Sequence, residues 1–249
     1  MKLIFYDIPS RLARKAWSPN TWKTRYCLNY KGIPYQTEWV EYPDIEPLYK
    51  EIGLQPTSVK PDGTPRCTLP AIHDPSTGVK MGNSFDIAEY LDQKYPNSPR
   101  IFPHNSAGIQ APFAGAFAAH VKPIWNFLVP PECEILNPRS AEWFRQSREK
   151  EFGVARLEDI TPTGDRRVKE WKKVERGFAK IDAWYAKNGG SGPFIWATPC
   201  WADFVVGGYL AWIRAALGEE SEEWRDFTSW HGGRWKALAE GLKKYEEIH

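Results

Sequence analysis

Ser18 and Asn20 are the residues near the N-terminus whose types and spacing could do chemistry. Ser18 precedes a proline and an aromatic face that repeats every four residues from Trp22, so its hydroxyl is predicted to cap a helix. Taken alone, this is an ordinary N-cap. Serine is too weak an acid to act as a base, but its hydroxyl can donate a hydrogen bond, and the helix N-terminus adds a positive field. A second donor is expected from Asn20, ahead of Thr21.

Two further motifs could hold an extended or charged ligand. Leu69-Pro70 opens a predicted strand, and from the sequence alone its peptide bond is expected to be trans, because only about 5–6% of X-Pro bonds in folded proteins are cis. Ser84 is predicted to cap the following helix, directly after Asn83. The N–H groups at such a helix start form a ready site for a carboxylate.

Composition and charge argue against several classes of partner. Of the 249 residues, 42% are hydrophobic, and the net charge of +2 gives no reason to expect nucleic acid or an anionic membrane as a partner. The 13 Trp, 12 Phe and 11 Tyr indicate first a large core and second a pocket for flat aromatic ligands. No apolar run is long enough to span a bilayer, and the apolar start of the chain is too short for a signal peptide.

Cysteine and histidine spacing gives no sign of a metal site or of a disulfide framework. The five histidines lack metal-ligand spacing, and the four cysteines are scattered, so no metal is predicted. A reducing compartment, most simply the cytoplasm, is therefore the expected location. The cysteines are Cys27, Cys67, Cys133 and Cys200.

The elements that must position these motifs begin with a β-α-β unit, which normally closes right-handed with its strands parallel. The proline-rich stretch 41–66 is longer than a compact connection needs, and it is predicted to contain a short helix near 46–51. The other elements predicted in this half are strands at 2–7, 35–39, 68–73 and 79–81 and helices over 19–31 and 84–94.

The second half is predicted to be all helical, because no strand alternation of any length follows a proline-rich linker. A domain boundary is expected in that linker, which gives domains at 1–95 and 104–249. The predicted helices are at 106–128, 140–153, 165–188, 200–217 and 222–245.

This order of elements resembles a thioredoxin-like α/β domain followed by the all-α domain of the soluble glutathione transferase superfamily. The first matching stretch most resembles the bacterial glutathione-dependent β-aryl-etherases and the related serine-type fungal etherase-like class. The resemblance implies an N-terminal domain that binds glutathione as a co-substrate, with no separate cofactor, and a helical domain that contributes the second-substrate site. The three stretches that carry it are residues 18–25 (SPNTWKTR), 68–72 (TLPAI) and 83–91 (NSFDIAEYL).

The resemblance implies a role for the first two motifs. Ser18 would donate a hydrogen bond to the glutathione thiolate, with Asn20 assisting. A thiol with a pKa of ~8.5 is only slightly ionised at neutral pH. Each unit by which the pKa is lowered corresponds to ~1.36 kcal/mol of selective thiolate stabilisation. A cis bond at Leu69-Pro70 would turn the Leu69 N–H and C=O outward to pair with the cysteinyl backbone of glutathione, as an added strand does.

The ends of glutathione and the second substrate would contact other residues. Asn83 and Ser84 would hold the γ-glutamyl end, and a basic residue of the 41–66 stretch would hold the glycyl carboxylate. The candidates for that basic residue are Lys50, Lys60 and Arg66. An aromatic wall for the second substrate is expected at Phe113, Phe117 and Trp125, although core packing explains each of them singly.

Two positions depart from the pattern of the superfamily. Asn83 stands where an acidic residue is usual, so its contact with the γ-glutamyl ammonium would be weakened or shared with Asp86. A helical-domain cap appears as Cys200 with Asp203 three residues later. Because a thiol is a poor cap, Thr198 followed by proline could substitute for it.

Two functions follow from these motifs. The first is a glutathione transferase, a detoxification enzyme and homodimer, that delivers the thiol to an aromatic or aryl-ether electrophile. The alternative is a ligandin, which binds glutathione and carries small flat aromatic ligands with little turnover. A scaffold with a transferase fold is disfavoured because the glutathione motifs are largely intact, and a disulfide enzyme because Ser18 is not a cysteine.

Overall fold

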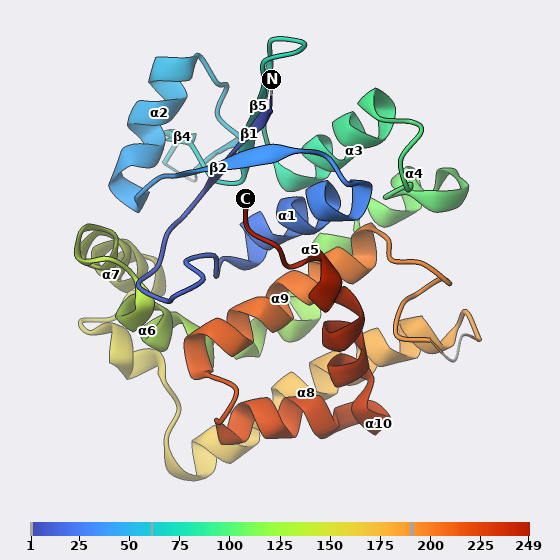
Figure 1. The fold of residues 1–249 in the computed structure, drawn as a ribbon. Helices are drawn as coiled ribbons and strands as arrows, with labels where there is room; N and C mark the ends of the chain where they lie inside the picture. Colours follow the sequence, from blue (N-terminus) through green and yellow to red (C-terminus); the bar gives the residue numbers. More distant parts are fainter. Residues whose placement is uncertain (1, 61, 190–191) are drawn as a thin grey trace.

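The N-terminal half of the computed structural model, which describes residues 2–60, 62–189 and 192–249, contains a four-stranded mixed sheet. The strand order is β2-β1-β5-β6, in which β1 and β2 are parallel and β5 is antiparallel to both of its neighbours (Figure 1). This is the predicted thioredoxin-like arrangement. Its elements are β1 (Leu3–Asp7), α1 (Pro19–Lys31), β2 (Tyr35–Trp39), α2 (Ile45–Ile52), β3 (Ser58–Val59), β4 (Pro65–Arg66), β5 (Ala71–Asp74), β6 (Val79–Gly82) and α3 (Ser84–Lys94).

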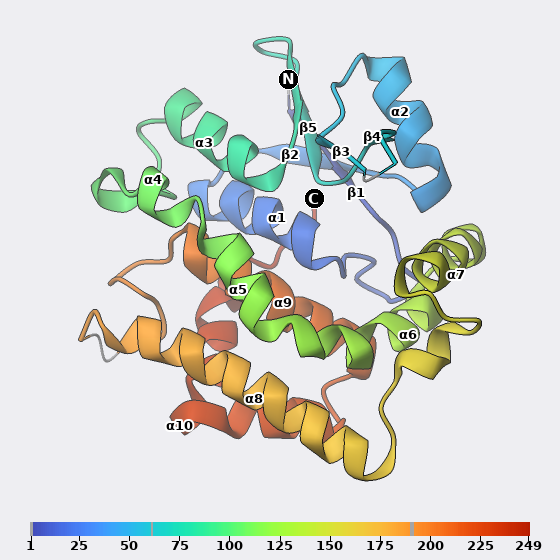
Figure 2. The same ribbon diagram turned by 180° about the vertical axis from the view of Figure 1, so that it is seen from behind.

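Helices make up the second half, as predicted. Helix α9 runs through the middle of this half in both views, with α1 along one side and α8 and α10 on the other (Figures 1 and 2). Helix α5 crosses in front of α9 in Figure 2. The helices are α4 (Ala107–Gln110), α5 (Phe113–Val121), α6 (Trp125–Ile135), α7 (Pro138–Phe152), α8 (Gly164–Ala186), α9 (Trp201–Leu217) and α10 (Glu222–Leu242), with short 3-10 turns that include η1 (Tyr42–Asp44), η3 (Lys122–Ile124) and η5 (Lys243–Tyr245).

The single helix predicted over 106–128 is wrong. The chain forms α4, α5, η3 and the start of α6 there, because prolines stand at the breaks. Pro112 precedes α5, and Pro123 lies in the first turn of η3. A proline has no N–H to donate to the preceding turn, so it starts a new helical segment more readily than it continues one.

The start of α9 decides between the two caps that the sequence offered, Cys200 and Thr198. Cys200, not Thr198, is the N-cap, and it forms a capping box with Asp203. The Asp203 carboxylate accepts hydrogen bonds from the backbone N–H of Cys200 (2.9 Å) and of Ile195 (3.1 Å). The carboxylate therefore supplies the stronger half of the box and compensates for the weak thiol acceptor. Burial raises the pKa of Asp203 to about 6.

The packing of α9 against α1 fixes the position of the α1 N-terminus. A Cβ atom at Gly208 would lie 2.5 Å from the carbonyl oxygen of Pro19, so a glycine is needed where the two helices approach. Farther along, the Tyr26 ring stacks on Phe204 at a centroid distance of 5.9 Å. Ser18, directly before Pro19, thus stands where α9 packs against the start of α1.

The first part of the long stretch 41–66 docks on α7. The backbone N–H of Tyr42 donates to Ser140 Oγ (2.9 Å), and Arg139 forms a bidentate pair with Asp44 at 2.8 and 2.9 Å. The rest of the stretch forms α2 and the β3–β4 hairpin. The segment therefore ties the two halves together before it reaches the edge of the sheet.

In the described ranges, no helix is long and apolar enough to cross a membrane. No group of three or more His, Cys, Asp or Glu side chains that could hold a metal ion occurs in the same part of the chain.

Candidate active site

A cavity of about 280 Å³ lies beside the first turn of α1, at the edge formed by β4, the start of β5 and the start of α3. Six of its nine lining residues are predicted site residues, and three, Thr57, Ser58 and Thr68, are not. The six are Asn20, Arg66, Leu69, Pro70, Asn83 and Ser84.

Ser18 caps α1, two residues before Asn20 of the cavity wall. Its Oγ accepts a hydrogen bond from the backbone N–H of Asn20 at 3.4 Å, and the residue is only 4% exposed. Because the Oγ acts as an acceptor in this bond, its own proton remains available for donation to a ligand. Ser18 does not itself line the cavity, but Asn20 does. The helix N-terminus adds a positive field at this point.

The Leu69-Pro70 peptide bond is cis, as the resemblance predicted and the sequence alone did not. Among the described residues, the Leu69 N–H and C=O have no hydrogen-bond partner. The preceding residue is held in place, since the Tyr49 hydroxyl donates to the Thr68 carbonyl at 2.6 Å and Thr57 Oγ1 lies 2.9 Å from Thr68 Oγ1. A fixed loop thus presents an unpaired backbone donor and acceptor, which is what an added strand requires.

The cap of α3 is Asn83 and not Ser84, which corrects the prediction. Asn83 Oδ1 accepts a hydrogen bond from the Phe85 N–H at 3.0 Å, and Ser84 is the first helical residue. The Asn83 φ angle is 67°, a left-handed value that asparagine tolerates better than most residues do. Both residues line the cavity at the positive end of α3, whereas Asp86, the proposed partner in the ammonium contact, does not.

Of the three basic candidates, the structure places Arg66 alone on the cavity wall. Arg66 pairs with Ser58 in the β3–β4 hairpin, and its carbonyl accepts from the Thr57 N–H at 2.9 Å. Lys60 is an exposed residue at the hairpin turn and does not line the cavity. Lys50 is exposed on α2 and pairs with Glu46 at 2.7 Å.

The three aromatic candidates for the second-substrate wall differ in how deeply their side chains are buried. Phe117 is fully buried in the helical core, where it packs against Phe178 and Tyr209 at 5.7 and 4.8 Å between ring centroids. It therefore cannot present a surface to a ligand without repacking. Phe113 and Trp125 are half-buried. None of the three lines the 280 Å³ cavity.

Sequence reasoning missed a buried acid on α6. Trp17, the residue before Ser18, packs against Tyr42, and Glu132 of α6 lies among Tyr42, Arg148 and Trp212. Burial raises the pKa of Glu132 to about 8, although those three neighbours each oppose the rise, so the group is mostly neutral at pH 7. In the sequence, a glutamate that follows two prolines gives no sign that its side chain is buried and has a raised pKa.

Comparisons with known proteins agree on one family. The chain matches the models of the glutathione S-transferase N-terminal domain at residues 17–94 and C-terminal domain at 108–245. It is 33% identical to a glutathione S-transferase-like protein of Aspergillus flavus, over 95% of this chain and 88% of that one. A crystal structure of a glutathione S-transferase of Ceriporiopsis subvermispora in complex with glutathione is 43% identical, with a TM-score of 0.95 over 100% and 99% of the chains. A glutathione transferase of Phanerochaete chrysosporium is 40% identical, with a TM-score of 0.93 over 100% and 99%.

Proposed function

Because the chain belongs to the glutathione S-transferase family, we propose that it binds glutathione in the 280 Å³ cavity and activates the thiol for attack on an aromatic or aryl-ether electrophile. The observation that carries the proposal is the meeting of four features at one cavity. They are the start of α1 with its cap at Ser18, the unpaired backbone of Leu69, the positive end of α3 and the basic residue Arg66.

Each feature suits one part of the tripeptide. The Leu69 N–H and C=O would pair with the cysteinyl backbone, which directs the sulfur toward the start of α1. Ser18 would donate to the thiolate, and Asn20, on the cavity wall, would be a second donor. Asn83 and Ser84 would hold the γ-glutamyl end, and Arg66 the glycyl carboxylate. In this proposal residues 1–95 bind glutathione, and residues 104–249 supply the second-substrate site, with Phe113 and Trp125 as its half-buried aromatics.

The preference for aryl ethers rests on the likeness of residues 18–25 to the etherase-like class. The alternative is a ligandin, and the aromatic content of the chain fits either function. Turnover separates the two: a transferase conjugates glutathione to an aromatic electrophile or cleaves an aryl ether, whereas a ligandin binds such compounds and leaves them unchanged. The four cysteines that the structure leaves unpaired fit the reducing compartment that glutathione chemistry needs.

Replacement of Arg66 by glutamine is expected to weaken glutathione binding about 10- to 100-fold, because a hydrogen bond to a charged group contributes about 1.5–3 kcal/mol. Isothermal calorimetry measures the change. Lys60→Gln is the matched control, since it removes the same charge from the same hairpin outside the cavity, and it should bind as the wild type does. Equal losses in both variants would mean that the positive field of the hairpin, and not a contact with Arg66, attracts glutathione. No heat at millimolar glutathione in the wild type would contradict the proposal itself.

We also propose that the protein is a homodimer, as the family resemblance implies. Light scattering should give twice the monomer mass of 28.6 kDa at micromolar concentration. A monomer mass across that range would rule the dimer out.

A further inference from the structure

The wall of the 280 Å³ cavity carries positive charge and no carboxylate. Of its nine lining residues, which all belong to the described part of the chain, Arg66 is the one with a charged side chain. The first turns of two helices also reach the cavity, since Asn20 of α1 and Ser84 of α3 both line it. Each helix start adds a partial positive charge. The wall therefore suits anions and offers no ion-pair partner to a cation.

A buried lysine one helical turn after Asn20 adds to this positive field. Lys23 is 8% exposed, and burial lowers the pKa of its ammonium to about 8, with no carboxylate neighbour to oppose the change. It is therefore still mostly charged at pH 7. Lys31, on the same face of α1, pairs with Asp92 of α3 at 2.8 Å, so this face points toward α3.

Asn83 gives the γ-glutamyl end of a bound glutathione a donor and no negative charge. Its Oδ1 is neutral and already accepts the Phe85 N–H at 3.0 Å as the cap of α3. The rest of the amide is an NH₂ group with two donors. A donor can bind a carboxylate but not an ammonium, which has only donors itself. Asn83 thus favours the carboxylate of the γ-glutamyl end over its ammonium.

The acids on neighbouring elements do not replace the missing carboxylate. Asp86 is an exposed residue in the first turn of α3. Asp62, near the hairpin turn, accepts from the Thr64 N–H at 3.0 Å and from the Thr64 hydroxyl at 2.6 Å. Glu46 of α2 pairs with Lys50 at 2.7 Å. All three acids lie outside the cavity wall.

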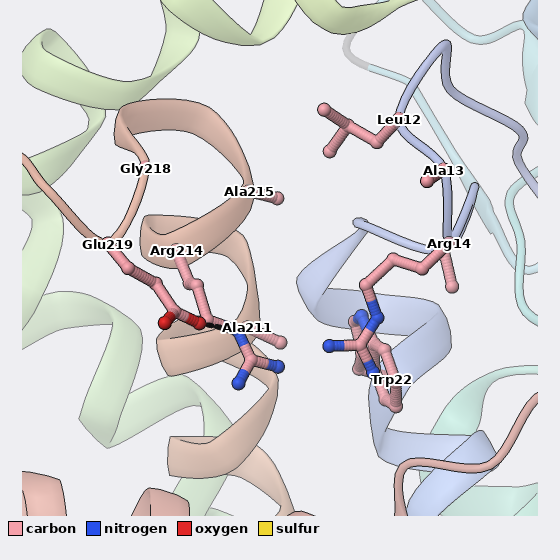
Figure 3. Close-up of a pocket in the computed structure, with 10 residues that line it drawn as sticks. Leu12, Ala13, Arg14, Trp22, Ala211, Arg214, Ala215, Gly218 and Glu219 are labelled. Atoms are coloured by element: carbon pink, nitrogen blue, oxygen red, sulfur yellow. Dashed lines mark ion pairs between the residues drawn. The ribbon is translucent and has the colours of Figure 1, made fainter.

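A pocket of about 360 Å³ between the β1–α1 loop and α9 shows the opposite arrangement (Figure 3). Figure 3 marks the ion pair between Arg214 and Glu219, which are 3.6 Å apart. Glu246 lies 2.7 Å from Arg214 and 3.0 Å from Arg14. The arginines of that pocket are thus neutralised by acids of the same chain. Arg66 has no acidic partner among the described residues, so its charge is left for a ligand anion.

We propose that the cavity recognises glutathione by its two carboxylates and its peptide backbone and not by its ammonium, so that it also takes acyl-cysteinylglycine thiols that keep both carboxylates and lack the amine. The inference deepens the proposed function and rests on it. An ammonium bound at this wall would lose water and gain no counter-charge, which is unfavourable. A ligand without the amine avoids that loss and should bind at least as well.

The test is isothermal calorimetry with glutathione and with glutaryl-cysteinylglycine, which is glutathione without its amine. The des-amino thiol is expected to bind within about threefold of glutathione, or more tightly. A larger preference for glutathione would overturn the inference, because it would mean that a carboxylate of this chain or of a second copy holds the ammonium. Absence of heat with both thiols would contradict the proposed function, and this inference with it.

Variants locate the discrimination. Asn83→Asp places the missing carboxylate on the wall and keeps a cap of equal quality, so it should keep the free energy of unfolding. It should shift the ratio of the two affinities toward glutathione at least about tenfold. Ser84→Asp, which puts a carboxylate at the first helical position, serves the same purpose if Asn83→Asp does not fold. An unchanged ratio in a folded variant would overturn the inference.

Asp86→Asn is the matched control. It removes a carboxylate from the first turn of the same helix, outside the cavity wall, and it should leave the ratio of the two affinities unchanged. A shift of that ratio toward the des-amino thiol would assign the ammonium contact to Asp86 and would refute the inference.

Discussion

Replacement of Asp7 by asparagine is expected to lower the free energy of unfolding by about 3–5 kcal/mol, because it leaves the Arg25 guanidinium buried without its counter-ion. The two side chains are 2.6 Å apart, and neither has any exposed surface. Asparagine keeps the shape of Asp7, and its carbonyl can still accept from the Ile8 N–H, which is 2.7 Å from Asp7 Oδ1. The substitution therefore keeps the size of the side chain and the bond to Ile8, but it removes the charge and replaces the Oδ2 acceptor of Arg25 with an amide nitrogen.

The other contacts of Arg25 cannot compensate for the loss. Its second terminal nitrogen donates to the Tyr35 hydroxyl at 3.0 Å and to Thr37 Oγ1 at 3.2 Å, but both acceptors are neutral. The Arg25 Nε is buried and has no partner within the described residues, so the network is already incomplete. The loss of the Asp7 acceptor would therefore leave a second buried N–H group of Arg25 without a hydrogen-bond partner.

Urea unfolding of the purified protein measures this effect. The double variant Asp7→Asn, Arg25→Met should recover much of the lost stability, since no buried charge then remains. Glu46→Gln, which breaks the fully exposed pair with Lys50, is the matched control and should leave stability unchanged. If Asp7→Asn proved no worse than Glu46→Gln, the pair between Asp7 and Arg25 would contribute nothing to the fold.

Helix caps, the spacing of aromatic residues and strand alternation predicted most of the fold, because in most elements these local patterns agree with the tertiary packing. The cap at Ser18, the aromatic period of α1 and the alternation of β2 all point to the β-α-β unit that the structure contains. The effect of each proline on the helix boundaries could not be predicted. Pro112 and Pro123 begin new segments, whereas Pro130 and Pro131 lie inside α6. Only burial against the rest of the domain separates these two cases, and burial is not visible in the sequence.

The site was predicted in pieces, and tertiary geometry decided among the alternatives. Asn83 and Ser84 are adjacent and both can cap a helix, so the choice depends on the φ angle at which the chain leaves β6. Arg66 and Lys60 are both in the β3–β4 hairpin, but the strand register brings only Arg66 to the cavity. Ser58 and the two threonines on the wall were missed because such residues are common in any loop.

Ser18→Ala is expected to raise the pKa of the thiol of bound glutathione by about one to two units, because it deletes a hydrogen bond to a charged sulfur worth roughly 1.5–3 kcal/mol. Thiolate absorbance against pH measures the pKa directly. The conjugation rate should fall most at neutral pH, where the thiol needs help to ionise. It should approach the wild-type rate at high pH, where the thiol ionises unaided.

The loss of the cap must be separated from the loss of the donor, since Ser18 Oγ also accepts from the Asn20 N–H. Ser18→Asn keeps a good cap and should keep the stability, while the ionisation of the thiol changes. Ser221→Ala is the matched control on another helix. Ser221 caps α10 through the Trp224 N–H at 3.1 Å, so its loss costs a cap worth about 1 kcal/mol far from the glutathione cavity.

The two explanations of Ser18 therefore predict opposite patterns. If Ser18 is only a cap, Ser18→Ala and Ser221→Ala should lose similar stability, and the pKa of the bound thiol should be the same in every variant. If Ser18 serves the sulfur, only changes at Ser18 should raise that pKa, and Ser18→Asn should separate stability from ionisation. An unchanged thiol pKa in Ser18→Ala would return Ser18 to the role of a cap and would move the donor to Asn20, which lines the cavity itself.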